Sequence, residues 1–187
     1  FIKDAKLSFL RNYKLDNLNL IFGYEKNRLS IKDSSFLLND LSFKSNEILL
    51  KRLKDEFLIT GNVYHNKLSF DEKRIKLFIN PYFPNLELKK LNFNSNNNFS
   101  FKINKKLKIK NLEINSEIKI DELMFVNKFN LKEFFPKVRE NFLFSDNKIS
   151  VNYKNNDLKI NGKGNILYQE NNDILSYTLI KKNKDLD

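Results

Sequence analysis

Residues 99–120 read FSFKINKKLKIKNLEINSEIKI, and apolar and polar side chains alternate along almost the whole stretch. Successive side chains of a β-strand point to opposite faces, so this alternation predicts strands with one apolar and one polar face. After Asn111 the apolar positions change from odd to even numbers, as a β-bulge or a tight turn would make them do. The apolar positions are Phe99, Phe101, Ile103, Leu107 and Ile109 before the change, and Leu112, Ile114, Ile118 and Ile120 after it.

The rest of the chain repeats this pattern in short segments that end in turns rich in Asn, Lys and Asp. Turn signals about every 8 to 12 residues are typical of antiparallel all-β proteins. We therefore expect an all-β, mostly antiparallel fold: a curved, groove-like or taco-like sheet, with a β-sandwich as the alternative. The inner face of the groove would carry Phe57, Ile59, Phe99, Phe101, Ile103, Leu107, Ile109, Leu112, Ile114, Ile118, Ile120, Ile149, Val151, Leu158 and Ile160.

One segment has helical spacing instead. Its apolar residues recur at intervals of three and four, which predicts a short helix near 131–142 that packs its apolar side against the sheet. Pro136 would start the second half of this helix or kink it. The packing residues would be Leu131, Phe134, Phe135, Val138 and Phe142.

Other segments give less regular signals. Ile75, Leu77 and Ile79 alternate, which favours a further strand that ends before Pro81. The polar stretches 64–67 and 94–98 are interpreted as turns, and the four glycines as turn or bulge residues.

The domain organisation is expected to be simple. We interpret residues 1–187 as a single β-rich segment of a longer repetitive protein, with a possible sub-boundary near Pro81–Pro84 and a helical insertion at 130–142. The sequence shows neither a run of about 20 apolar residues nor the apolar core of a signal peptide. Any anchor or export signal would therefore lie upstream.

The charge of the chain favours an anionic partner. Lys and Arg total 34 against 23 Asp and Glu, a formal net charge of +11. Lys far outnumbers Arg, and Asn, Ile and Phe are abundant, as in proteins from AT-rich genomes. The basic residues are also spread along the whole chain and do not form one patch. We therefore attribute about half of the excess positive charge to nucleotide composition and not to an anionic partner.

The residues that catalysis most often uses are scarce. The chain has no cysteine and one histidine, His65, so a thiolate site or a Cys–His pair cannot form. Acidic neighbours at 55–56, 71–72 and 121–122 point to opposite faces of a strand or lie in turns among lysines, so they do not form an acid–base pair. We expect no enzyme, no cofactor and no metal.

Three segments resemble AsmA-like proteins of the YhdP/TamB type, in versions from AT-rich alphaproteobacterial genomes. They are residues 107–123 (LKIKNLEINSEIKIDEL), 131–136 (LKEFFP) and 158–166 (LKINGKGNI). The resemblance is clearest over residues 86–170. It implies a repeating β-groove protein that is anchored in the inner membrane upstream, crosses the periplasm and conducts phospholipid in outer-membrane biogenesis. The implied partners are phospholipid or another acyl-chain lipid, and both membranes through regions outside this chain.

The expected function is therefore non-enzymatic lipid handling, in which acyl chains cover the apolar face. One alternative is a structural or adhesive β-sandwich domain of a surface protein, whose second sheet would cover that face. A third is a basic nucleic-acid-binding module, because aromatic and lysine residues are interleaved near residue 100. Nucleic acid is not the expected partner, since Arg is scarce and the aromatic residues share their face with Ile and Leu.

Overall fold

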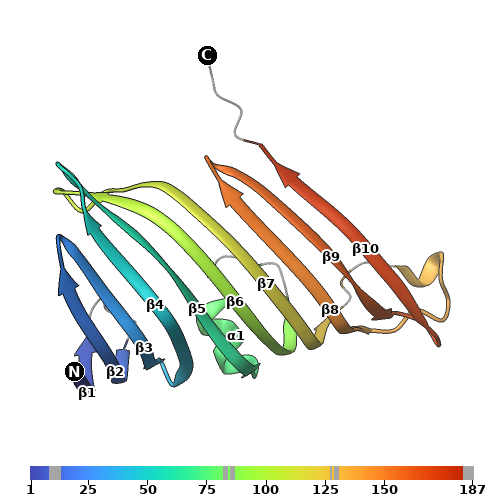
Figure 1. Ribbon diagram of the computed structural model, residues 1–187. Helices are drawn as coiled ribbons and strands as arrows, with labels where there is room; N and C mark the ends of the chain where they lie inside the picture. Colours follow the sequence, from blue (N-terminus) through green and yellow to red (C-terminus); the bar gives the residue numbers. More distant parts are fainter. Residues whose placement is uncertain (9–13, 82–83, 85–86, 127, 129–130, 183–187) are drawn as a thin grey trace.

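The computed structural model describes residues 1–8, 14–81, 84, 87–126, 128 and 131–182. Within them, ten strands form one sheet in which each strand lies beside its neighbours in sequence (Figure 1). All neighbouring pairs are antiparallel, so the predicted all-β antiparallel fold is confirmed. The strands are β1 (Ile2–Ser8), β2 (Lys14–Glu25), β3 (Arg28–Leu38), β4 (Leu41–Arg52), β5 (Glu56–Phe70), β6 (Leu88–Asn104), β7 (Ile109–Val126), β8 (Asn141–Lys154), β9 (Asp157–Leu167) and β10 (Asn172–Lys181).

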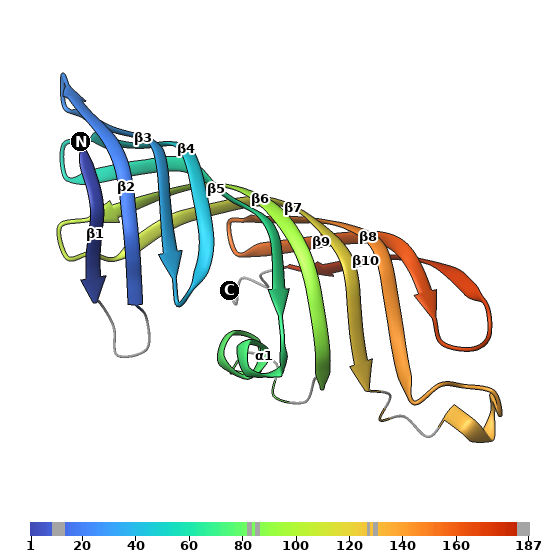
Figure 2. The ribbon, with the colours of Figure 1, turned by 90° about the horizontal axis from the view of Figure 1, so that it is seen from below.

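The sheet is bent into a trough. Figure 2 shows the strands curving along their length, with the helix α1 (Glu72–Phe78) on the inside of the bend against β5 and β6. The described residues form one open sheet, so the groove-like fold is confirmed and the sandwich alternative is not what forms.

Irregular residues inside the strands account for the bend. Several strands contain a residue with positive φ, and register shifts interrupt many of the ladders. A bulge bends its strand and increases the local twist. The predicted change of parity in β7 is one of these, since Asn111 has a φ of 48°. The other such residues inside strands are Asp4, Asn17, Asp33, Lys67 and Asp146.

Three hairpins close through two-residue turns of Asn, Asp and Lys. Lys26–Asn27, Asn39–Asp40 and Asn155–Asn156 all have positive φ, as a type I′ turn requires at both central positions. These turns confirm the prediction that strands end in turns rich in Asn, Lys and Asp. The interpretation of the glycines as turn residues is wrong, since all four lie within strands and none has positive φ. The bulge interpretation holds for Gly164, which lies opposite the register shift in β8 between Ser145 and Lys148.

The helix α1 forms where a strand was predicted. Asp71 is its N-cap, and its Oδ1 accepts a hydrogen bond from the backbone nitrogen of Arg74 at 2.9 Å. Glu72 in the first turn and Lys76 in the last complement the helix dipole. Ile75, at 2% exposure, points into the sheet. The connection that contains α1, Pro81 and Pro84 joins β5 and β6, which are neighbours in the sheet.

The helix predicted near 131–142 is wrong in extent. Within residues 131–142, all of which the structure describes, the only helix is the three-residue 3-10 helix η1 (Leu131–Glu133), and β8 begins at Asn141. Pro136 disfavours helical φ and ψ at Phe135 and removes a backbone donor, so the helix cannot continue. Leu131 is half-buried, Phe134 and Phe135 are 75% and 46% exposed, and Val138 and Phe142 are buried.

Two predicted turns lie inside long strands. Residues 64–67 belong to β5 and residues 94–98 to β6, and the two segments pair with each other, for example Tyr64 with Asn96. Asn, Ser and His are poor signals of strand in isolation. Here a cross-strand hydrogen bond joins the side chains of His65 and Ser95.

Candidate functional site

The predicted inner-face residues lie together on one face of the sheet, except Leu107. Ladder partners share a face. Phe57 pairs with Ile103 and Ile59 with Phe101 across β5 and β6, and the face continues across the later strands. The continuing pairs are Phe99–Ile114, Ile103–Ile109, Ile118–Ile149 and Val151–Ile160, and Leu158 faces Tyr153. Leu112 and Ile120 occupy the same face of β7 by alternation.

Leu107 differs because the chain turns there. It lies between β6 and β7 with a φ of 57° and is 79% exposed, so it lies outside the strands, in a turn on one rim of the trough. The alternation read across residues 99–120 therefore joins two strands and the turn between them.

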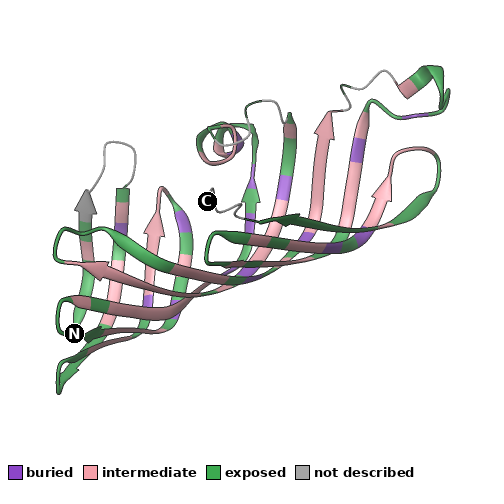
Figure 3. Cartoon of the chain, turned by 90° about the horizontal axis from the view of Figure 1, so that it is seen from above, coloured by how far each residue is buried: buried purple, intermediate pink, exposed green. Residues whose placement is uncertain are grey.

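This apolar face is only partly covered. Ile120 is buried, but Phe57 is 40% and Ile109 is 58% exposed, and the other inner-face residues in the strands are half-buried. Figure 3 shows buried positions as short patches within the strands, with exposed residues at the hairpin ends. Since a second sheet is absent from the described residues, the apolar face is open to an apolar partner.

The helix α1 covers one part of the trough. Ile75 packs in a core cluster with Leu68 and Phe70 of β5 and Leu91 of β6. Phe70 and Phe93 meet edge to face, with ring centroids 5.4 Å apart. α1 thus closes the inner face over β5 and β6, and the apolar surface on either side remains uncovered by it.

A cavity of about 330 Å³ extends the apolar surface into the C-terminal strands. Ligand pockets span about 300–1,000 Å³, so this cavity is near the lower limit. Of its lining residues only Ile120 and Ile149 were predicted, although the alternation of apolar residues at 123–125, 142–144 and 175–179 indicates most of the others. The lining residues are Leu88, Ile120, Leu123, Phe125, Phe144, Asn147, Ile149, Leu175 and Tyr177.

A row of small polar side chains crosses the inner face. Ser34 pairs with Ser45, His65 with Ser95, and Asn97 with Ser116. All but Asn97 are buried, and Asn147 of β8, also buried, extends the row. We call these seven residues the polar row. It separates the apolar side chains near α1 from those near the opposite ends of the strands.

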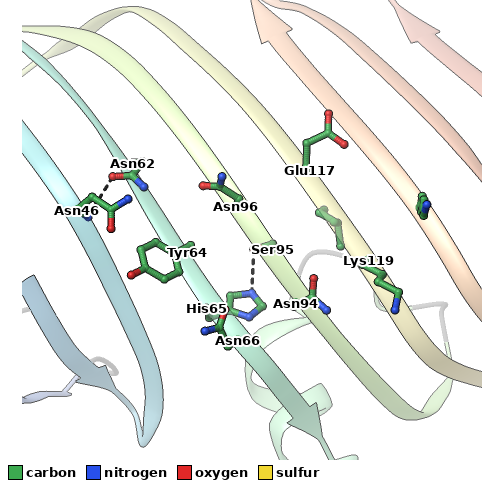
Figure 4. A pocket seen from close by; sticks show the side chains of 12 residues that line it. Asn46, Asn62, Tyr64, His65, Asn66, Asn94, Ser95, Asn96, Glu117 and Lys119 are labelled. Atoms are coloured by element: carbon green, nitrogen blue, oxygen red, sulfur yellow. Dashed lines mark hydrogen bonds between the residues drawn. The ribbon is translucent and has the colours of Figure 1, made fainter. Parts of the chain in front are cut away.

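The burial of His65 in this row favours its neutral form. Asn97 Nδ2 donates to Ser95 Oγ at 2.8 Å, and Ser95 Oγ shares a hydrogen bond with His65 Nε2, also at 2.8 Å (Figure 4). Phe43 and Phe93 flank the ring edge to face. Burial lowers the pKa of His65 below its usual value of 6.5. The sequence places His65 in a polar turn, whereas in the structure it lies within β5 and is 4% exposed.

The opposite face of the sheet is polar. Glu56 Oε1 pairs with Lys110 Nζ at 2.8 Å, which lowers the pKa of Glu56, and Glu122 pairs with Lys90 at 2.7 Å. A depression of about 520 Å³ on this face is lined largely by amide side chains of β5 and β6, such as Asn62 and Asn96 (Figure 4). Asn62 Oδ1 accepts from the backbone nitrogens of residues 46 and 47, where the β4–β5 ladder is irregular.

Neither a metal site nor a membrane-spanning helix is evident in the part of the chain that the structure describes. It contains no group of three or more His, Cys, Asp or Glu side chains able to hold a metal ion. None of its helices is long and apolar enough to cross a bilayer. In comparisons with protein-family models, curated proteins and solved structures, the chain matches none of them.

Proposed function

We propose that this chain is a non-enzymatic lipid-handling segment whose trough holds acyl chains of phospholipid. The observation that carries the proposal is the apolar inner face on either side of the polar row, whose side chains stay half-exposed because no second layer among the described residues covers them. Acyl chains would cover this face at a gain of about 0.8 kcal/mol for each buried methylene. In this role the lipid takes the place that a second sheet has in a sandwich.

The dimensions of the trough support this role. Strands lie about 4.8 Å apart, so the nine spacings of this ten-stranded sheet give a trough about 43 Å long. An acyl chain spans half of a bilayer core of about 30 Å, or about 15 Å. The trough is therefore longer than one acyl chain, as passage of lipid along it would require.

The resemblance to AsmA-like proteins supplies the setting of the proposal. In that setting the segment lies in the periplasm as part of a longer protein anchored in the inner membrane, and it conducts phospholipid towards the outer membrane. The polar outer face, where lysines pair with acids, would face water.

Native mass spectrometry of the chain purified from bacteria tests the proposal. We expect co-purified phospholipid, and a loss of occupancy of about tenfold or more in Ile109→Asp and Ile160→Asp, because a charge on the apolar face must be desolvated when a lipid binds. Ile109 is 58% exposed, so Ile109→Asp should leave the fold intact.

The matched control is Asn115→Asp on the polar face of β7, whose side chain accepts a hydrogen bond from Asn152 that an aspartate can also accept. It adds the same charge and should keep its lipid. A folded wild-type chain without bound lipid, or equal occupancy in all three variants, would overturn the proposal in favour of a structural β-domain.

A further inference from the structure

The depression of about 520 Å³ on the polar face lies in the interior of the sheet. Its lining residues come from β4 to β8, and each of these strands has a neighbour on both sides. A further strand at either edge of the sheet would therefore leave the depression unchanged. Asn46 and Asn66 line it where register shifts interrupt the β4–β5 and β5–β6 ladders. A bulge bends its strand and redirects side chains, which accounts for a hollow at this position.

Four amide side chains in the depression have no hydrogen-bond partner in the described part of the chain. They are Asn46, Asn66, Asn94 and Asn96. Amides elsewhere on this face bond across strands, for example Asn152 Nδ2 to Asn115 Oδ1. An amide side chain carries two N–H donors and a carbonyl acceptor. The depression therefore concentrates free donors and free acceptors within a small area (Figure 4).

The charged groups around the depression balance one another. Glu117 and Lys148 line it, both are exposed, and neither forms an ion pair within the described residues. The third charged residue of the lining, Lys119, is neutralised by Asp121 at 3.2 Å. An anion in the depression would be repelled by Glu117, and a cation by Lys148. Charge complementarity therefore favours an uncharged ligand that both donates and accepts hydrogen bonds.

We propose that this depression binds a neutral oligosaccharide. Each sugar hydroxyl both donates and accepts hydrogen bonds, as the lining amides do. Tyr64 lines the depression and is half-buried, so its ring offers a rigid apolar surface to the C–H groups of a sugar (Figure 4). The volume of about 520 Å³ lies within the range of about 300–1,000 Å³ that is typical of ligand pockets.

Other occupants fit this site less well. An extended peptide adds to a sheet at an edge, where backbone N–H and C=O groups are unpaired, whereas the strands here are paired on both sides. A nucleic acid needs an excess of cationic groups to neutralise its phosphates, and the charges of the depression balance. Because the depression lies on the face opposite to the apolar trough, saccharide binding is independent of the lipid binding proposed above.

Isothermal titration calorimetry of the chain with three uncharged tetrasaccharides tests the proposal. The probes are chitotetraose, cellotetraose and maltotetraose, and sodium tripolyphosphate is the anionic comparison. We expect a dissociation constant below about 1 mM for at least one tetrasaccharide and no binding of tripolyphosphate at that level. Failure of all three saccharides to bind, or equal binding of tripolyphosphate, would overturn the proposal.

Asn96→Leu places the test in the depression itself. It keeps nearly the same volume, removes the hydrogen-bonding groups and should weaken binding of the best tetrasaccharide about tenfold or more. Asn46→Leu on β4 should act in the same direction. The matched control is Asn98→Leu, because Asn98 lies on the same face of β6, is also exposed and without a described hydrogen-bond partner, and is not part of the lining. Equal affinity in Asn96→Leu and Asn98→Leu would overturn the assignment of the site.

The salt dependence of binding tests whether the ligand is held by hydrogen bonds or by charge. Salt screens interactions between exposed charges, so the affinity for a neutral saccharide should change by less than about twofold between about 0.05 and about 0.5 M sodium chloride. A fall of about tenfold or more over this range would show that charged groups hold the ligand, and would overturn the proposed recognition of an uncharged one.

Discussion

Gly164 of β9 lies against Asn147 of β8 with no room for a side chain between them. A Cβ atom on Gly164 would lie 2.5 Å from the Cα of Asn147. The side chain of Asn147 fills this space and is 2% exposed. Its Nδ2 donates to the carbonyl oxygens of Ser145 and Asn165 at 3.0 and 3.2 Å. Gly164 is therefore a packing requirement of the inner face at the bulge in β8.

Substitution of Gly164 by alanine should destabilise the fold by about 1 to 3 kcal/mol, because the backbone of β8 must move. The same change at Gly162 should cost less. The nearest atoms there belong to the ring of Tyr177, which is 37% exposed and can rotate away. Urea unfolding of the two variants checks the order. A larger loss of unfolding free energy in Gly162→Ala than in Gly164→Ala would show that the contact between Gly164 and Asn147 is not the tighter packing constraint.

Burial of neutral His65 makes the fold sensitive to mild acid. The folded pKa is lowered below the unfolded value of 6.5, so the unfolded chain binds the proton more readily. Stability should therefore be fully present above pH 6.5 and fall as the pH drops from there towards the folded pKa, by at most about 1.4 kcal/mol per pH unit.

His65→Phe removes the titrating group and keeps an aromatic ring between Phe43 and Phe93. Unfolding free energies measured between pH 5.5 and 7.5 should lose this slope in the variant, whatever the variant's absolute stability. An equal slope in wild type and variant would assign the acid sensitivity to carboxylates.

The class of fold follows from the sequence because alternation is a local signal. Side chains such as Ile114, Ile118 and Val151 alternate with polar neighbours, and each strand needs only its own period of two to reveal its apolar face. Turn signals between the strands then indicate an antiparallel meander. No single strand encodes whether a second sheet covers its apolar face, so the alternation fits both a β-sandwich and an open trough. The strand order distinguishes the two folds.

The errors arise where tertiary contacts override a local pattern. Ile75, Leu77 and Ile79 alternate, yet capping by Asp71 and the packing of Ile75 on the sheet select a helix. His65 carries no local sign of burial, because its partner Ser95 comes from the next strand, 30 residues away. The polar row as a whole was unpredictable for the same reason.

The helix α1 should act as the main stabilising cover of the trough. Ile75→Ala removes the most buried side chain of the core cluster and should cost about 2 to 4 kcal/mol. Asp71→Ala removes the N-cap only and should cost about 1 kcal/mol. Chemical unfolding gives both values, and binding of an apolar fluorescent dye should rise more in Ile75→Ala. Small and equal losses of unfolding free energy in Ile75→Ala and Asp71→Ala would show that α1 contributes little to the stability of the core.

The β2–β3 turn leaves room for stabilisation. Lys26 and Asn27 have φ values of 45° and 65°, a left-handed conformation that asparagine tolerates better than lysine. The Lys26–Glu25 ion pair spans 3.7 Å with both side chains more than 80% exposed, so its loss should matter little. Lys26→Asn should therefore stabilise the fold by about 0.5 to 1 kcal/mol in urea unfolding. Lys159→Asn makes the same change within β9, where lysine has no positive φ, and should be neutral or slightly destabilising. If Lys26→Asn gave no gain over Lys159→Asn, backbone strain at Lys26 would not limit stability.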